Sequence, residues 1–294
     1  MILLQSRKVF LLASAIMALL LSSSSAQAKT AVVFGATGVV GNEVLRAVAN
    51  EDYFTEIIVV GRREFPPKVT DLLPENAVKI IHKDFGTIDQ HEGLAEMHAD
   101  ACFVAAASGF PHLSDMHDWH YAEVVMAESI AKVCGKMNTT AITIFTAVEP
   151  GDEAEDFSPE ELVKTGTPMG WWPVMTETIR MMRLKEKAVV SASAGTIPSI
   201  RIFRPSNIIT KESRYGWVDS VLFKFHGVFD EWLPTEYHSV TTELLAESMV
   251  KDAVNVLSGK TEVFDVDEKG AVRLNYGDFL TIVGKGKEQK TTEL

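Results

Sequence analysis

The sequence has little cysteine and no excess of positive charge. Of its 294 residues only Cys102 and Cys134 are cysteines, too few for a disulfide framework, which a domain of this size does not need. Both lie in segments that we expect to be buried, so packing in the core is their predicted role. Asp and Glu number 40 against 28 Lys and Arg, which gives a formal net charge of −12. An acidic chain without a basic stripe argues against a nucleic-acid partner.

Apolar runs long enough to span a membrane are also missing after the N-terminus. The first 28 residues contain the basic pair Arg7-Lys8, an apolar run over residues 9–21 and the small-residue site Ala26-Gln27-Ala28. This order is typical of a secretory signal peptide cleaved after Ala28. We therefore predict entry into the secretory pathway or an organelle reached through it. The alternatives are an uncleaved membrane anchor at residues 9–21, a run shorter than the roughly 20 residues of a spanning helix, and a bipartite organelle-targeting sequence.

Strand-like and helix-like segments alternate along the rest of the chain. Short apolar, β-branched runs predict strands at residues 30–34, 56–60, 77–81, 100–106, 141–145 and 198–203. Between them, helical spacing predicts helices at residues 38–49, 119–134 (stopped by Gly135) and 174–193. Alternation of this kind predicts βαβ units in a doubly wound parallel α/β sheet of six or seven strands, a Rossmann fold.

One domain accounts for most of the chain. We expect the Rossmann domain to occupy residues 29–284, with small cap elements from about residue 206, and to be followed by a polar tail at 285–294. Residues 151–173, which include Trp171-Trp172-Pro173, are expected to form a long loop near the active edge, where the tryptophans would line a substrate wall or pack the loop.

A glycine-rich segment follows the first predicted strand and opens a helix. Its spacing, Gly35-x-x-Gly38-x-x-Gly41, suits a tight turn, a close approach of the backbone to a pyrophosphate and close packing of the helix on the sheet. The free N–H groups and the positive dipole end of that helix favour phosphate binding. Its position between a strand and an amphipathic helix makes the motif a strong indication of a dinucleotide site.

The residues after the next strands favour NADP over NAD. Arg62 and Arg63 stand where an NAD-selective site usually has an acidic residue, and two guanidinium groups can pair with a 2′-phosphate. The alternative is that both arginines only form a solvated turn. Asp84, after the third strand, is placed to meet the adenine amino group. The small residues from Ala105 to Ser108 would let the cofactor lie against the backbone.

These motifs resemble those of atypical short-chain dehydrogenases/reductases, and within them the oxidoreductase group that includes the human Tat-interacting protein and fungal mitochondrial relatives. The resemblance extends from about Thr30 to about Leu257, over the segments GATGVVG, VVGRRE, KDF, DACFVAAAS, Phe203-Arg204-Pro205 and His238-Ser239-Val240. It implies that NADP is bound by Gly35, Thr37, Gly38, Val39, Gly41, Arg62, Arg63, Asp84, Phe85, Ala105, Ala106, Lys185 and Pro205.

The resemblance also implies a catalytic set, in which one member is missing. Family reductases use a Ser or Thr after the fifth strand and a Tyr-x-x-x-Lys on the next helix, with the tyrosine as general acid. Thr146 and Lys185 match the hydroxyl residue and the lysine, but the tyrosine position holds Met181, whose thioether cannot donate a proton. Three explanations stay open: another acid, such as Tyr121, His120 or a water held by Thr146, replaces the tyrosine; the substrate needs no strong general acid; or the site binds NADP without reducing anything.

Two functions therefore stay open. The first is an NADP-dependent oxidoreductase that reduces a small carbonyl compound of unknown identity, with Thr146, Lys185 and Tyr121 as catalytic candidates. The second is a non-catalytic NADP-binding redox sensor or interaction protein. A polar stretch with His112, Asp115, His117, Asp118 and His120 matches no zinc signature, so no metal is expected. The helices at 119–134 and 174–193 are those that related folds use for dimer contacts, which makes a homodimer possible.

Overall fold

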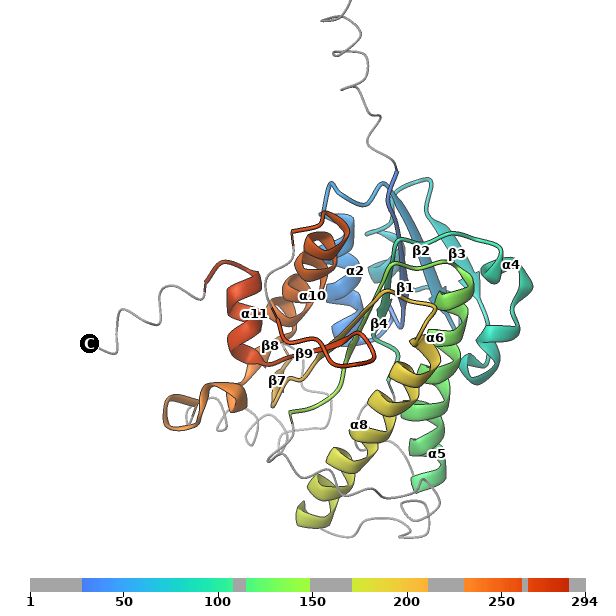
Figure 1. Cartoon of the computed structure of the whole chain (residues 1–294). Helices are drawn as coiled ribbons and strands as arrows, with labels where there is room; N and C mark the ends of the chain where they lie inside the picture. The colour runs from blue at the N-terminus through green and yellow to red at the C-terminus, as the bar shows by residue number, and fades with distance from the viewer. Residues whose placement is uncertain (1–27, 108–114, 149–170, 211–229, 261–263, 286–294) are drawn as a thin grey trace, which may run out of the picture.

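The computed structural model describes residues 28–107, 115–148, 171–210, 230–260 and 264–285, with backbone only for 171–176 (Figure 1). A seven-stranded sheet runs through these residues in the order β3-β2-β1-β4-β5-β6-β9, and every pair of neighbours is parallel. The strands are β1 (Thr30–Phe34), β2 (Glu56–Gly61), β3 (Val78–Ile81), β4 (Ala101–Val104), β5 (Ala141–Phe145), β6 (Ser199–Phe203) and β9 (Ala271–Leu274). The predicted fold class and the six predicted strands are confirmed.

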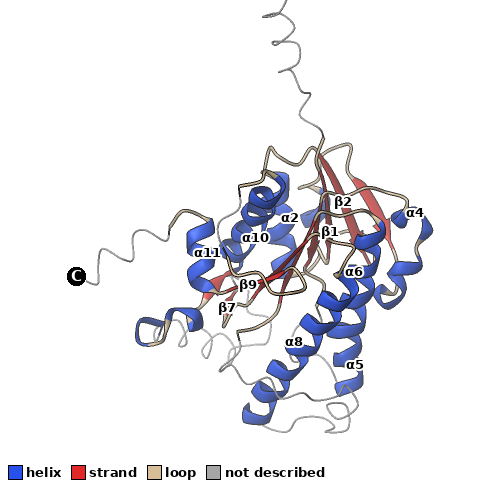
Figure 2. Ribbon diagram, in the orientation of Figure 1, coloured by secondary structure: helices blue, strands red, loops and turns tan. Residues whose placement is uncertain are grey.

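Helices cover both faces of the sheet (Figure 2). One layer contains α6 (Met126–Lys136) and α8 (Trp171–Ser193), and the other contains α2 (Val39–Ala49), α10 (Thr242–Leu257) and α11 (Tyr276–Ile282). Alternate residues of the central strands enter opposite cores: Val32 of β1 packs toward α6 and α8, and Val33 packs toward α2 and α10. Burial on both faces explains why central strands such as β1 and β4 consist of continuous apolar runs, whereas the edge strand β3 is largely exposed.

The strand order reverses between β1 and β4. From β1 the chain first builds outward through β2 and β3, and then returns to the other side of β1 with β4, β5 and β6. At such a switch point the loops after the two central strands part, which opens a crevice at the carboxyl edge of the sheet. The glycine loop after β1 and the small residues after β4 lie against each other at this point.

Shorter elements connect the main ones. They are α3 (Pro67–Thr70), η1 (Phe85–Gln90), α4 (Glu92–Ala95), α5 (Met116–His120), η2 (Tyr121–Val125), β7 (Ile208–Ile209), η3 (Asp230–Trp232), η4 (Thr235–Tyr237) and β8 (Val240–Thr241). Strands β7 and β8 form a separate parallel pair in the region expected to form a cap. The same region also supplies α10, which lies in the layer with α2, and β9, which is the last strand of the main sheet.

The helix predicted at 119–134 differs in its limits and its regularity. It begins at Met116, where Asp115 caps the first turn by accepting from the Asp118 N–H, and its middle turn, Tyr121–Val125, is a π-helix. Gly135 does not stop it, since the helix continues to Lys136. A Cβ at Gly135 would lie 2.9 Å from Oγ1 of Thr196, so this glycine serves close packing, and Asn138 (φ 55°) makes the left-handed turn instead.

The two cysteines were expected to pack without a bond, and this was wrong. Both are fully buried as predicted, but the structure joins them in a disulfide with a Cα–Cα distance of 6.5 Å. Cys102 points from β4 into the core beneath α6, and Cys134 lies on the buried side of α6. Residues 32 positions apart meet because the helix packs back onto its own strand, which spacing alone does not show.

The tryptophan pair before the predicted helix is part of that helix. Residues 171–173 form the first turn of α8, where a proline is tolerated because the first N–H groups have no helical partner. Most of the expected active-edge loop, residues 151–170, lies outside the described residues. Within those residues, none of the helices is long and apolar enough to cross a membrane.

Candidate functional site

The glycine loop has the geometry of a phosphate cradle. Gly35 follows β1 with a φ of +86°, and the Gly38 N–H donates to its carbonyl at 2.9 Å. A Cβ at Gly35 would lie 2.5 Å from the Ala106 nitrogen, and one at Gly41 would lie 2.1 Å from the Gly35 oxygen. Only glycine fits these two positions, because any side chain would overlap backbone atoms. The loop is thereby closed tightly against the residues that follow β4.

The N-terminus of α2 is open to an anion. Gly38 is its N-cap and has no side chain to accept from the first N–H groups, and no acidic residue stands in the first turn. Thr37 is exposed, and Val39 begins the helix half-buried. The unpaired N–H groups and the helix dipole therefore favour a negatively charged group at this point. The residues present fit the pyrophosphate of a dinucleotide.

The two arginines after β2 lie on the surface beside the third strand's end. Arg62 and Arg63 are both exposed, directly after the buried Gly61. Arg62 is near enough to Asp84 for its positive charge to contribute to lowering the pKa of that carboxyl, after hydrogen bonds from Tyr121 and the Gly86 N–H. A 2′-phosphate bound by these arginines and an adenine beside Asp84 would thus share one region of the edge.

The third strand's end holds a compact polar group. Asp84 is exposed and caps η1 through the Gly86 N–H at 2.9 Å, while Phe85 is buried in the core. The Tyr121 hydroxyl donates to Oδ1 of Asp84 at 2.5 Å, and this hydrogen bond, followed by burial, raises the pKa of Tyr121 to about 12. Tyr121 therefore lies beside the residues that follow β3. A proton held this firmly makes the hydroxyl a weaker acid at neutral pH, and its catalytic role stays a prediction.

Thr146 belongs to a buried ionic network. It follows β5, is 5% exposed, and its hydroxyl donates to Oε1 of Glu186 at 2.7 Å. Arg204, which follows β6, donates to both oxygens of the same carboxylate, and Arg273 of β9 adds a contact of 3.3 Å. Pro205, next to Arg204, is buried and accepts the Val148 N–H through its carbonyl. The hydroxyl expected to orient a carbonyl is thus already a hydrogen-bond donor to the protein.

Lys185 is held by a second buried pair. Its ammonium lies 3.1 Å from Oε2 of Glu123, on the π-helical turn, and 5.3 Å from the centre of the Phe145 ring. Both charged side chains are nearly inaccessible, with 1% and 4% exposure. Met181, one turn before, has no exposed surface and lies in a small apolar cluster. The other buried members of this cluster are Met116, Trp119, Val124 and Leu184.

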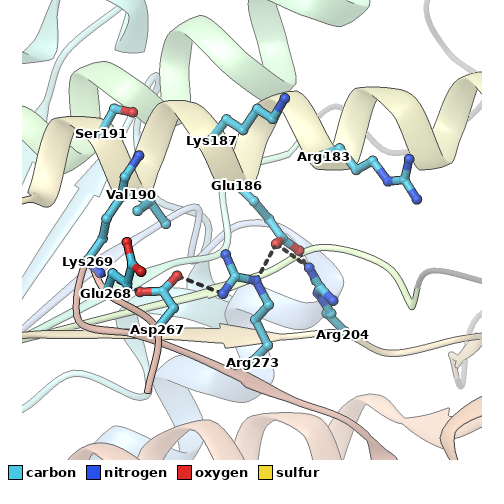
Figure 3. A pocket seen from close by; sticks show the side chains of 10 residues that line it. All are labelled: Arg183, Glu186, Lys187, Val190, Ser191, Arg204, Asp267, Glu268, Lys269 and Arg273. Carbon is cyan, nitrogen blue, oxygen red and sulfur yellow. Dashed lines mark hydrogen bonds and ion pairs between the residues drawn. The ribbon is translucent and has the colours of Figure 1, made fainter. Parts of the chain in front are cut away.

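A cavity of about 600 Å³ lies beside Glu186, between α8 and β9 (Figure 3). Glu186 lies between Arg204 and Arg273, and Arg273 also reaches Asp267 at 2.8 Å. The remaining lining residues are Arg183, Lys187, Val190, Ser191, Glu268 and Lys269. Charges of both signs line this cavity.

Part of the polar stretch after β4 lies outside the described residues, including His112. In the segments that the structure describes, no group of His, Cys, Asp and Glu is arranged to hold a metal ion. Asp115 caps α5, because its side chain accepts a hydrogen bond from the Asp118 N–H.

Sequence reasoning did not find Glu123, Glu186 and Arg273. Their charges on segments that pack inside the protein were a usable signal, because ionisable side chains are rarely buried without a partner. Their partners come from elements far apart in the chain, so only the folded structure identifies them.

The comparisons with known proteins agree with the fold described above. Residues 31–173 match the model of the NAD dependent epimerase/dehydratase family. No curated protein matches the chain at a significant level.

Solved structures with the same fold include several epimerases. A UDP-glucose 4-epimerase has a TM-score of 0.55 and 14% identity over 90% of this chain and 82% of its own. The Helicobacter pylori ADP-L-glycero-D-manno-heptose-6-epimerase has 0.54 and 13% over the same shares. MoeE5, solved with UDP-glucuronic acid and NAD, has 0.51 and 13% over 84% of this chain and 76% of its own. At these identities the likeness shows the fold alone.

Proposed function

We propose that this chain, an atypical NAD(P)-binding member of the short-chain dehydrogenase/reductase superfamily, binds NADPH in preference to NADH at the carboxyl edge of its sheet. The observation that carries the proposal is the glycine loop, which leaves the α2 N-terminus open beside two exposed arginines. Membership of the Tat-interacting-protein group stays a prediction.

The cofactor preference rests on charge. A 2′-phosphate carries two negative charges near neutral pH, and the guanidinium groups of Arg62 and Arg63 offer charge-assisted hydrogen bonds, each contributing about 1.5–3 kcal/mol in a typical protein. NADH has a ribose hydroxyl at the same place, and no acidic side chain follows β2 at the two positions nearest the strand to accept from it.

A titration followed by thermal shift tests this proposal, with the protein lacking residues 1–28. Binding to the folded state alone stabilises it by RT ln(1 + [L]/Kd), about 2.7 kcal/mol at a hundredfold excess over Kd. We expect NADPH to raise the Tm and NADH to do so much less. Replacing both Arg62 and Arg63 by alanine should weaken NADPH binding at least about tenfold and leave NADH binding unchanged.

The matched control is Arg46→Ala, because Arg46 is an exposed arginine that pairs with Glu43 at the far end of α2. It should bind NADPH as the wild type does. Equal stabilisation of the wild type by NADPH and NADH would refute the NADP preference, and no stabilisation by either would refute the dinucleotide site.

The second question is whether the residues around Met181 catalyse a reduction. When bound, the cofactor supplies a hydride for the reduction of a carbonyl, and family reductases complete the step with a tyrosine proton. Here Met181 is fully buried among apolar side chains, Lys185 is paired with Glu123, and Thr146 donates to Glu186. These three observations favour a binding-only role, as a redox sensor or interaction protein, over the reduction of a small carbonyl compound.

Met181→Tyr distinguishes the two roles, with Met181→Leu as the control for altered packing. If the wild type oxidises NADPH in the presence of a panel of small aldehydes and ketones, the chain is a reductase that uses another acid. If the wild type is inactive while binding NADPH, the binding-only role holds, and turnover gained only by the tyrosine variant would show which group had been lost.

We also propose entry into the secretory pathway. The leader at residues 1–28 supports it, and so does the buried Cys102–Cys134 disulfide, because disulfides persist mainly in oxidising compartments. Mass spectrometry of the protein purified from its own cells would test both parts. A mature chain that begins at Lys29 and is two hydrogens lighter than the dithiol form is expected, whereas a full-length reduced chain would refute the proposal.

A further inference from the structure

Tyr121 occupies an unusual place for a candidate catalytic acid. It opens the π-helical turn that interrupts the helix after β4, and 40% of its surface is exposed. Its hydroxyl crosses to the end of β3 and donates to Oδ1 of Asp84, 37 residues earlier in the chain. A π-helical turn widens the helix locally and often occurs at functional sites. Here it brings a side chain to the rim where the adenine half of a dinucleotide is expected.

The carboxylate of Asp84 is oriented by two donors on one oxygen. Oδ1 accepts from the Tyr121 hydroxyl and from the Gly86 N–H at 2.9 Å. Among the described residues no donor contacts Oδ2, and the side chain is exposed. An ionised carboxylate is an acceptor only, so Oδ2 is available to a ligand that offers an N–H group. The exocyclic amine of adenine is such a donor.

Gly86 makes room for the tyrosine. A Cβ at this position would lie 2.1 Å from the Tyr121 hydroxyl oxygen and 2.6 Å from the ring carbon that bears it. The phenol therefore lies directly against the Gly86 backbone. This contact and the hydrogen bond to Asp84 together fix its position. Arg62 lies on the same rim, since its charge acts on Asp84.

We infer that Tyr121 is a positioning residue for the adenine half of the cofactor: through its bond to Oδ1 it holds Asp84 so that Oδ2 accepts from the adenine amine. This inference rests on the proposed NADPH site and assigns Tyr121 to the adenine end instead of to proton transfer. The opposite arrangement, in which Tyr121 fills the place of the base and must leave before it binds, makes a prediction of opposite sign.

The test compares Tyr121→Phe with the wild type by calorimetric titration. The probes are NADPH, adenosine 2′,5′-bisphosphate for the adenine half and reduced nicotinamide mononucleotide for the other half. Loss of one neutral-to-charged hydrogen bond at an exposed site should weaken NADPH and the bisphosphate by about the same factor, about fivefold. Binding of the mononucleotide should not change, which a general loss of structure would not reproduce.

Two further variants make the test specific. Gly86→Ala should displace the phenol and weaken the same two probes, and combining it with Tyr121→Phe should add little, because both remove one contact. Tyr53→Phe, which removes a hydroxyl from a half-buried tyrosine near Phe54, is the matched control and should bind every probe normally.

The outcomes separate the two proposals. If the wild type binds NADPH and Tyr121→Phe binds it equally well, the positioning role is refuted and the NADPH site stands. Tighter binding of the bisphosphate by Tyr121→Phe would refute it in favour of the occluding arrangement. If the wild type binds none of the three probes, the NADPH site itself is refuted.

Discussion

Gly41→Ala is the sharpest test of the phosphate cradle, because a single methyl group would meet backbone atoms. The added Cβ would lie 2.1 Å from the Gly35 oxygen and 3.2 Å from the Ala105 side chain. The loop after β1 would have to move by about 1 Å to relieve this overlap, and overpacking of this kind costs about 2 kcal/mol. For a domain of this size that corresponds to a fall in Tm of about 4–8 °C.

The same movement would shift the N–H groups at the start of α2. A displacement of about 1 Å in a binding constellation reduces its performance strongly, so NADPH binding should weaken by at least about tenfold. Differential scanning fluorimetry with and without NADPH measures both effects in one experiment. The control is Gly277→Ala in α11, because the added Cβ would meet only the Thr235 methyl carbon, at 3.7 Å. A Gly41→Ala protein that melts within about 1 °C of the wild type and binds NADPH normally would refute the close-contact argument.

Two further predictions concern buried charges. Burial raises the pKa of Asp100, but hydrogen bonds from Lys29 at 2.7 Å and from the Thr30 N–H at 2.9 Å, with the nearby positive charges, together outweigh it. The pKa of this carboxyl therefore lies below its usual value. The carboxylate therefore contributes stability above about pH 4, and this stability is lost as the pH falls through the folded pKa. We expect Asp100→Asn to lower the free energy of unfolding at pH 7 and to have a smaller effect in acid. Urea denaturation of both proteins across this pH range measures the difference. An unchanged difference at pH 3 would contradict it. Arg201→Met should lower the free energy of unfolding by about 3–5 kcal/mol, because Asp252 stays buried without the arginine that binds it at 2.7 Å. Adding Asp252→Leu should restore most of that loss. A double variant no more stable than the single one would argue against an unpaired charge as the cause.

The sequence by itself determined the architecture and the local geometry of the glycine loop. Continuous apolar, β-branched runs such as TAVVF and AITIF indicate strands that are buried on both faces. Strands of this kind belong to a parallel sheet between two helical layers. The glycine spacing is a local backbone property, so the tight turn at Gly35 and the close packing at Gly41 could be predicted directly, and the structure has both.

Limits of helices were less predictable, because they depend on neighbours. Gly135 has the signature of a helix stop, but the packing of Thr196 against it keeps the helix intact until Asn138 turns the chain. The seventh strand was expected in number but not located, since the short run Ala271–Leu274 becomes a strand only by pairing with β6.

Only the tertiary structure decided the partners of the buried polar groups. Glu123 and Lys185 are 62 residues apart, Tyr121 and Asp84 are 37 apart, and Thr146 and Glu186 are 40 apart. Each pair joins a helix to another helix or to a strand end, and hydrogen bonding across such distances is set by how the layers pack, not by local periodicity. The glycine loop follows from local backbone chemistry, whereas the surroundings of Thr146 and Lys185 depend on long-range contacts that no spacing in the sequence records.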